Sequence, residues 1–271
     1  MLLQEFFSYS FILRALAGGC LVGALCGMLG VFLVLRRLSL IGDGLSHVTF
    51  GSVALAMLLG VTQVPVTVAA IPVVMLCSLG ILRLTEKAGG HADASIGIVS
   101  SLGVAGGIII ASLAGGFNVD LFSYLFGNIL SISGVEVRIS LALFVLVLLA
   151  VFLFYNDLFA VTFDEELART SGIRTGRINT ILVLITALVV VLAMKVVGIM
   201  LVSALIILPS VTALQLAQGF RGALLLSVLT AVVAVTTGIF VSFSLNLPAG
   251  ATVIVVNFLL FCLACLVRRL R

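Results

Sequence analysis

Nine long apolar runs, separated by short polar stretches, dominate the sequence. They cover residues 11–35, 43–60, 64–82, 94–115, 137–155, 178–196, 198–217, 221–243 and 248–267. A helix needs about 20 apolar residues to cross the hydrocarbon core of a bilayer, and most of these runs approach that length. Each run must be helical, because lipid offers no hydrogen-bond partner to backbone groups. The pattern predicts an all-α, polytopic membrane bundle, with eight or ten spans as alternatives to nine.

The composition supports this class and excludes others. Of the 271 residues, 63% are hydrophobic and only 9% are charged, whereas soluble domains have about 45–50% and about 25%. Such a chain lacks the polar surface of a soluble enzyme or a disordered protein, and we expect no nucleic-acid partner. We expect one transmembrane domain over residues 1–271. A further apolar stretch, 121–132, is too short to span and is expected to form a re-entrant or interfacial helix.

The basic residues predict the orientation, because cytoplasmic loops collect Lys and Arg. One side of the predicted bundle carries most of them: Arg36, Arg37, Arg83, Lys87, Arg169, Arg174, Arg177, Arg221, Arg268, Arg269 and Arg271. The other side carries Arg14, Arg138 and Lys195. The richer side, with the C-terminus, is therefore expected to be cytoplasmic.

The longest polar stretch, residues 156–177, is predicted to hold a short cytoplasmic helix over about 163–171. Thr162 followed by Glu165 fits a capping box, and Gly172 fits a helix stop. Acidic residues suit the first turn of a helix, and the segment carries Asp164, Glu165 and Glu166 there. A solvated loop and a docking element for a soluble partner both fit this pattern.

Asp43 and His47 are the second polar feature, at the start of the second span. Ionisable groups inside a span are expensive and are functional candidates. At a spacing of four they share one helix face, so a carboxylate oxygen and an imidazole nitrogen can bind one transition-metal ion together. A structural Asp–His hydrogen bond and a proton relay remain alternatives. His91, in a charged loop, is expected to be solvated.

Enzyme motifs are not found. The sequence has no Gly-x4-Gly-Lys-Ser/Thr phosphate loop and no Gly-x-Ser-x-Gly elbow, so we expect neither ATPase nor hydrolase activity from this chain. Pro209 lies inside an apolar run and is expected to break or bend it.

Four motifs, in order along nearly the whole chain, resemble zinc/manganese-type ABC importer permeases. They are the stretch Arg36 to His47, the stretch 119–130, Met194 to Gly198 with Leu205 to Pro209, and Leu247 to Gly250. The resemblance implies a fold like that of the cobalamin and siderophore importers. It also implies a second copy of the permease, two ATP-binding cassette subunits that hold the ATP, and an extracytoplasmic metal-binding protein, at the inner membrane of a bacterium.

The resemblance also implies residue roles. Asp43 and His47 match the intramembrane metal-coordinating pair of the family. The family's ATPase-coupling segment matches Thr162, Phe163, Asp164, Glu165, Glu166, Leu167, Ala168 and Gly172. Asn118, Asp120 and Asn128 are candidates for an outer gate, although Asn128 stands where an acidic residue is common.

The expected cargo is Zn²⁺, then Mn²⁺, with no permanently bound cofactor. Asp plus His suits both ions, and the stretch 119–130 looks more like the zinc-type members. A single-chain, ion-coupled secondary transporter is the alternative function, but it would need more intramembrane acids or bases and usually inverted repeats. A structural scaffold would leave the Asp43–His47 pair unexplained.

Overall fold

The computed structural model describes residues 10–60, 66–88, 92–116, 124, 125, 127 and 132–270. Within these ranges all regular structure is helical, and nine helices are long and apolar enough to cross a membrane. The spanning helices are α2 (Ser10–Leu35), α3 (Ile41–Leu58), α4 (Val66–Ala88), α5 (Ala92–Leu113), α7 (Gly134–Leu153), α10 (Thr175–Val196), α11 (Val202–Leu216) with the preceding 3-10 turn η3 (Ile199–Leu201), α12 (Phe220–Leu245) and α13 (Ala249–Leu270). The predicted fold class is confirmed.

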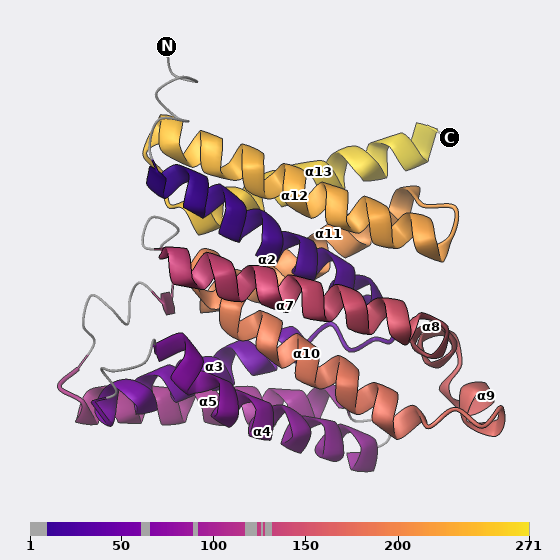
Figure 1. Cartoon of the computed structure of the whole chain (residues 1–271), viewed down its shortest axis with the longest axis horizontal. Helices are drawn as coiled ribbons and strands as arrows, with labels where there is room; N and C mark the ends of the chain where they lie inside the picture. The colour runs from indigo at the N-terminus through magenta and orange to yellow at the C-terminus, as the bar shows by residue number, and fades with distance from the viewer. Residues whose placement is uncertain are drawn as a thin grey trace.

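The spanning helices form two groups joined by central helices (Figure 1). Helix α2 packs on α11 and α12, which contact α13, while α3 packs on α4 and α5. Helix α10 contacts both α2 and α4 and so connects the groups. The most apolar windows of α2 and α10 are 78% and 72% buried, against 11% for α7. The core therefore lies along α2 and α10, and α7 exposes most of its surface to lipid.

Small residues set the closest helix contacts, as is common between spanning helices. The Gly27 carbonyl of α2 accepts hydrogen bonds from the Ser227 hydroxyl of α12, at 2.7 Å, and from the Ser210 hydroxyl of α11, at 3.2 Å. A Cβ at Gly27 would lie 2.7 Å from the Ser227 carbonyl oxygen. One glycine thus lets three helices meet around a shared, buried acceptor.

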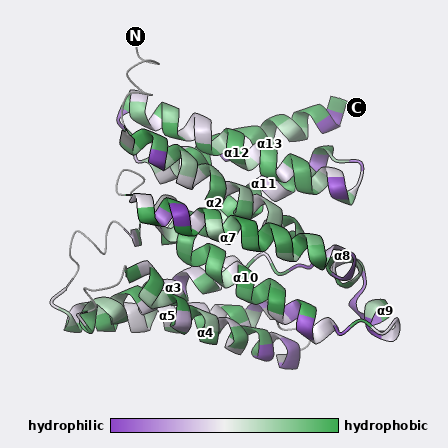
Figure 2. Ribbon diagram, viewed as in Figure 1, coloured by the Kyte–Doolittle hydropathy of each residue, from purple (hydrophilic) through white to green (hydrophobic). Residues whose placement is uncertain are grey.

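Two short helices, α8 (Tyr155–Phe163) and α9 (Glu165–Thr170), follow α7. Figure 1 shows both at the end of the bundle that also holds the C-terminus, opposite the N-terminus. Hydrophilic residues gather at this end in Figure 2, where α9 and the start of α10 lie. The two termini thus lie at opposite ends of the bundle, as an odd number of spans requires.

Three local features differ from expectation or were missed. Helix α11 continues through Pro209, and the interruption lies earlier, at η3, where Gly198 has a φ of +91°. Helix α7 begins with a capping box between Ser133 and Glu136 that the sequence reading did not identify. The predicted re-entrant stretch 121–132 falls almost entirely outside the described residues.

Candidate functional site

One open stripe runs along α3. Between Ile41 and Ala56 every residue is buried except Asp43, His47, Gly51 and Leu55, which are half-buried. These four positions are spaced by four residues and therefore share one face. The rest of the helix packs on α4, α5, α10 and α11. The only ionisable side chains of α3 thus lie at two of these four partly exposed positions, whereas a third, Gly51, faces the backbone of α5.

The two side chains lie close enough to bind one ion. His47 Nε2 is 3.6 Å from Asp43 Oδ2, with exposed side-chain fractions of 22% for His47 and 46% for Asp43. Donors at about 2.0–2.2 Å from a shared metal ion lie about 3.0–3.5 Å from each other. A separation of 3.6 Å is longer than a hydrogen bond but needs only a small adjustment to bring both donors to a metal ion.

The other polar side chains of α3 are satisfied locally. The hydroxyls of Ser46, Thr49 and Ser52 donate to the carbonyl four residues earlier, at 2.7, 2.7 and 2.8 Å. They are buried and spend their hydrogen on the helix backbone. The Asp43 and His47 side chains are therefore the donor atoms that α3 offers to a ligand.

Helix α5 holds the backbone of this site closely. A Cβ at Gly103 would lie 2.8 Å from the carbonyl carbon of His47, and a Cβ at Gly51 would lie 3.1 Å from the carbonyl oxygen of Gly103. The absence of side chains at both glycines lets the two backbones meet directly beside His47. The backbone at His47 is thus held by a helix-to-helix contact.

Each chain supplies only part of a metal coordination sphere. In the described part of the chain no group of three or more His, Cys, Asp or Glu side chains could hold a metal ion. Two protein ligands make a weak site, which suits an ion that must leave again.

The coupling segment differs in detail from its prediction. Thr162 and Phe163 belong to α8, and the buried Thr162 hydroxyl donates to the Leu158 carbonyl inside that helix. Asp164 is the N-cap of α9, and its carboxylate accepts from the Leu167 N–H at 2.9 Å. The predicted capping box of Thr162 with Glu165 is therefore wrong. The cause is that α8 continues through Thr162, which leaves the extended conformation of a cap to Asp164.

The predicted stop at Gly172 is confirmed. Gly172 has a φ of +89°, and its N–H donates to the Arg169 carbonyl at 3.1 Å while the Ile173 N–H donates to the Ala168 carbonyl at 3.0 Å. This pair of bonds is the Schellman motif, which places a left-handed residue after the helix. The buried Ala168 faces the protein, whereas Glu166 and Leu167 are exposed.

Glu165 connects three elements. Its Oε2 accepts from Arg36 Nη2 at the end of α2, at 3.0 Å, and its Oε1 accepts from Asn179 Nδ2 of α10, also at 3.0 Å. Arg169, one turn later in α9, lies at 3.6 Å from Oε1. Sequence reasoning missed this role because Arg36 is 129 residues away. The signal that existed was a basic pair directly at a predicted span end.

Arg36 carries this contact toward α3. Burial lowers the pKa of the guanidinium, and the neighbouring Glu165 carboxylate opposes that change, so the residue stays charged. After it, Arg37 adopts a φ of +57°, and the Leu38 N–H donates to the Leu33 carbonyl at 2.8 Å. The tight α2–α3 turn that results links Arg36 to Asp43, seven residues later.

Aromatic rings hold α8 against the bundle. The Phe220 ring of α12 has its centroid 5.2 Å from that of Phe159 and 5.8 Å from that of Phe163. Phe32 of α2 lies 5.4 Å from Phe220 on an edge-to-face geometry, which is favourable for such pairs. Helix α8 is thus packed on the ends of α2 and α12. These contacts hold the point at which α9 begins.

The candidate outer-gate residues Asn118, Asp120 and Asn128 lie outside the described residues, as does His91.

Nine helices of spanning length in the described residues define a polytopic membrane protein. Residues 8–268 match the ABC 3 transport family. The manganese transport system membrane protein MntC of Halalkalibacterium halodurans is 34% identical over 261 residues, which cover 96% of this chain and 88% of the relative. The manganese import system permease protein ScaB of Streptococcus gordonii is 33% identical, covering 96% of this chain and 94% of the relative.

A solved structure agrees. PsaBC from Streptococcus pneumoniae, in complex with Fab, has a TM-score of 0.86 at 31% identity and covers 97% of this chain and 94% of that chain. The chain belongs to the ABC 3 transport family and is a permease of a metal-ion ABC importer. The resemblance noted from the sequence is confirmed.

Proposed function

We propose that this chain forms the membrane pathway for a divalent transition metal and that Asp43 and His47 bind the ion during passage. The observation that carries the proposal is their placement: two metal-binding side chains, 3.6 Å apart, at partly exposed positions of α3. Family membership supports a transport role over a purely structural Asp–His pair. An ion-gradient mechanism in a single chain does not fit an ABC importer.

Mn²⁺ is the proposed cargo, with Zn²⁺ as the competing ion. Relatives at 33–34% identity are named for manganese transport or import, and a carboxylate with an imidazole suits Mn²⁺ as well as Zn²⁺. The expected preference for zinc rested on the affinity order of generic sites and on the likeness of residues 119–130 to zinc-type members. Metal uptake by a transport-deficient strain expressing the complete system, measured with each ion separately, distinguishes the two.

The proposed assembly has a second copy of this permease, two ATP-binding cassette subunits and an extracytoplasmic metal-binding protein, in the inner membrane of a bacterium. In this assembly the present chain forms a single permease domain over residues 1–271. The half-exposed carboxylate of Asp43 leaves room for ligands from the second copy. Such ligands would add to the two side chains that the described residues of one chain place at this site. ATP hydrolysis belongs to the separate cassette subunits.

Helix α9, with Asp164 to Gly172 around it, is the proposed docking element for the cassette subunit. Its outward face carries the exposed Glu166 and Leu167, while Glu165 turns inward to Arg36. Movement of α9 would thus act on the α2–α3 turn and so on the helix that bears the metal ligands. This connection supports alternating access driven by the ATPase.

The orientation proposed from the basic residues places α9 and the C-terminus in the cytoplasm. A variant with the five native cysteines replaced and one cysteine at position 167 or 247 tests it with a membrane-impermeant label. We expect labelling of position 167 from the cytoplasmic side only and of position 247 from the outside only. Labelling of both from one side would refute this topology.

Asp43→Asn and His47→Leu test the metal site. Asp43→Asn keeps size and hydrogen bonding, so a structural pair would tolerate it. We expect each single variant to lose most metal uptake while it still inserts and assembles with the cassette subunit. Ser46→Ala, beside the site but turned away from the open face, is the matched control and should retain uptake. Full uptake by the Asp43→Asn, His47→Leu double variant would end the assignment.

A further inference from the structure

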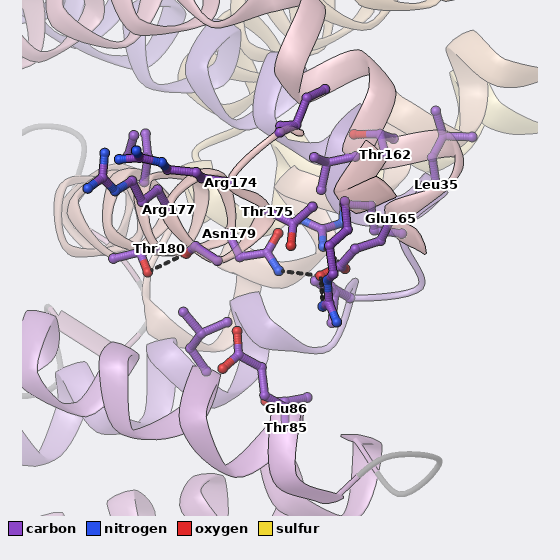
Figure 3. A pocket seen from close by; sticks show the side chains of 18 of the residues that line it. Leu35, Thr85, Glu86, Thr162, Glu165, Arg174, Thr175, Arg177, Asn179 and Thr180 are labelled. Atoms are coloured by element: carbon purple, nitrogen blue, oxygen red, sulfur yellow. Dashed lines mark hydrogen bonds and ion pairs between the residues drawn. The ribbon is translucent and has the colours of Figure 1, made fainter. Parts of the chain in front are cut away.

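A cleft opens at the α9 end of the bundle, between the α2–α3 turn, the C-terminal end of α4, helix α9 and the start of α10 (Figure 3). Its volume is about 1470 Å³. The site described above uses only one wall of it, where Glu165 meets Arg36 and Asn179. The remaining walls have no role in the proposed transport mechanism.

The cleft is strongly basic. Five arginines line it, Arg36, Arg37, Arg169, Arg174 and Arg177, against two glutamates, Glu86 and Glu165. Glu165 already binds Arg36 and lies near Arg169. For the guanidinium groups of the other three arginines, which are exposed, the described residues provide no ion pair or hydrogen bond. The cleft therefore holds uncompensated positive charge.

The start of α10 concentrates this charge. Arg174 is the N-cap of the helix, without a side-chain cap hydrogen bond, and Arg177 lies in the first turn. Cations at a helix N-terminus oppose the helix dipole, whereas an anion there is stabilised by both the dipole and the unbonded N–H groups. Figure 3 shows Arg174 and Arg177 grouped together, apart from the hydrogen bond between Glu165 and Asn179. The arrangement is costly alone and favourable once an anion is bound.

The apolar part of the cleft lining indicates which anion binds there. Its lining includes Leu35, Leu82 and Ile181, which belong to the ends of the spanning segments of α2, α4 and α10. Apolar walls at span ends beside a layer of arginines match a phospholipid, whose phosphate lies at the membrane surface above its acyl chains. Basic pockets between spanning helices are known to bind anionic headgroups.

We propose that this cleft binds the phosphate of an anionic phospholipid from the leaflet at the α9 end, with Arg174 and Arg177 as its principal contacts. A cassette subunit is less suited to the apolar part of the cleft, because Leu82 and Ile181 lie within the spans whereas α9 projects beyond the span ends (Figure 1). The bound lipid would neutralise the arginines that surround the Glu165–Arg36 contact. The inference does not depend on which metal is carried.

The test uses the purified transporter complex in nanodiscs of phosphatidylcholine alone or of an equal mixture with phosphatidylglycerol. Native mass spectrometry then counts the lipids retained after release from the nanodisc. We expect selective retention of phosphatidylglycerol by the wild type and a roughly 30-fold loss of it in R174Q/R177Q, the size expected when two arginines leave a phosphate layer. R268Q/R269Q is the matched control, because this pair ends α13 outside the cleft and should retain the lipid.

A second variant guards against misfolding. E86Q removes one of the two acidic residues of the cleft and should increase phosphatidylglycerol retention, a gain that a damaged protein would not show. Equal retention by wild type and R174Q/R177Q, or equal losses in both arginine pairs, would overturn the proposal. Tight binding of inorganic phosphate in phosphatidylcholine nanodiscs would reassign the cleft to a free anion. If R174Q/R177Q lost the cassette subunit but retained the lipid, the cleft would be reassigned to protein docking.

Discussion

Glu165→Gln tests whether the contact between α9 and the α2–α3 turn is energetically real. The change keeps the shape of the side chain and an oxygen for Asn179, but it removes the charge opposite Arg36. Breaking a buried ion pair costs about 3–5 kcal/mol and an exposed one about 0–1 kcal/mol. The Arg36 side chain is 9% exposed and that of Glu165 is 35% exposed. The pair lies between these limits, so we expect a loss of about 1–2 kcal/mol in the free energy of unfolding.

A double-mutant cycle isolates the pair. The free energy of unfolding in detergent is measured for the wild type, Arg36→Gln, Glu165→Gln and the double variant. We expect a coupling energy of about 1–2 kcal/mol, because each single change already removes the ion pair. In the assembled transporter, Glu165→Gln should also reduce metal uptake per ATP hydrolysed, since α9 is then held less firmly to the turn that leads to α3.

Glu166→Gln is the control for this cycle. Glu166 is the adjacent residue of the same helix, it is exposed, and the described residues give it no ion pair. We expect no measurable coupling with Arg36. Additive effects of Arg36→Gln and Glu165→Gln, or equal effects of Glu165→Gln and Glu166→Gln, would refute the reasoning.

Two further changes address the packing around the site. Gly103→Val would place a Cβ 2.8 Å from the His47 backbone and should sharply reduce uptake at normal membrane levels, whereas Gly106→Val, where a Cβ meets nothing within 4 Å, should be tolerated; equal uptake by both variants would contradict the close α3–α5 contact. Ser227→Ala removes the 2.7 Å hydrogen bond to the Gly27 carbonyl and should lower the free energy of unfolding by about 1 kcal/mol with uptake per folded molecule unchanged; unchanged stability would show that Ser210 alone satisfies the carbonyl.

The sequence alone predicted the helical bundle, which the structure confirms, whereas its direction in the membrane stays a prediction. The bilayer sets the length of a spanning helix and forbids any unpaired backbone, so apolar runs near that length could only become spans. Their number in the described residues agrees with the prediction. The pairing of Asp43 with His47 could be predicted too, because a spacing of four fixes a shared helix face. The stop at Gly172 was readable because a left-handed residue after a helix favours glycine.

The exact start of the coupling helix could not be predicted from the sequence. The sequence pattern predicted that Thr162 with Glu165 starts the coupling helix, whereas in the structure Asp164 is its N-cap. The extension of α8 through Thr162 decided the matter in favour of Asp164. Packing of Phe159 and Phe163 on Phe220 of α12 accompanies that extension, and it depends on a helix distant in the sequence.

Only the tertiary structure decided which faces are open and which distant charges meet. The half-exposed stripe of α3 results from four neighbouring helices that bury its other sides, and periodicity cannot say where neighbours stop. From the sequence, Glu165 fits a cap, a solvated acid or a docking residue. In the structure it instead forms an ion pair with Arg36. Hydrogen-bond spacing within one helix is a property of the local backbone, whereas an ion pair across 129 residues exists only once the spans have packed.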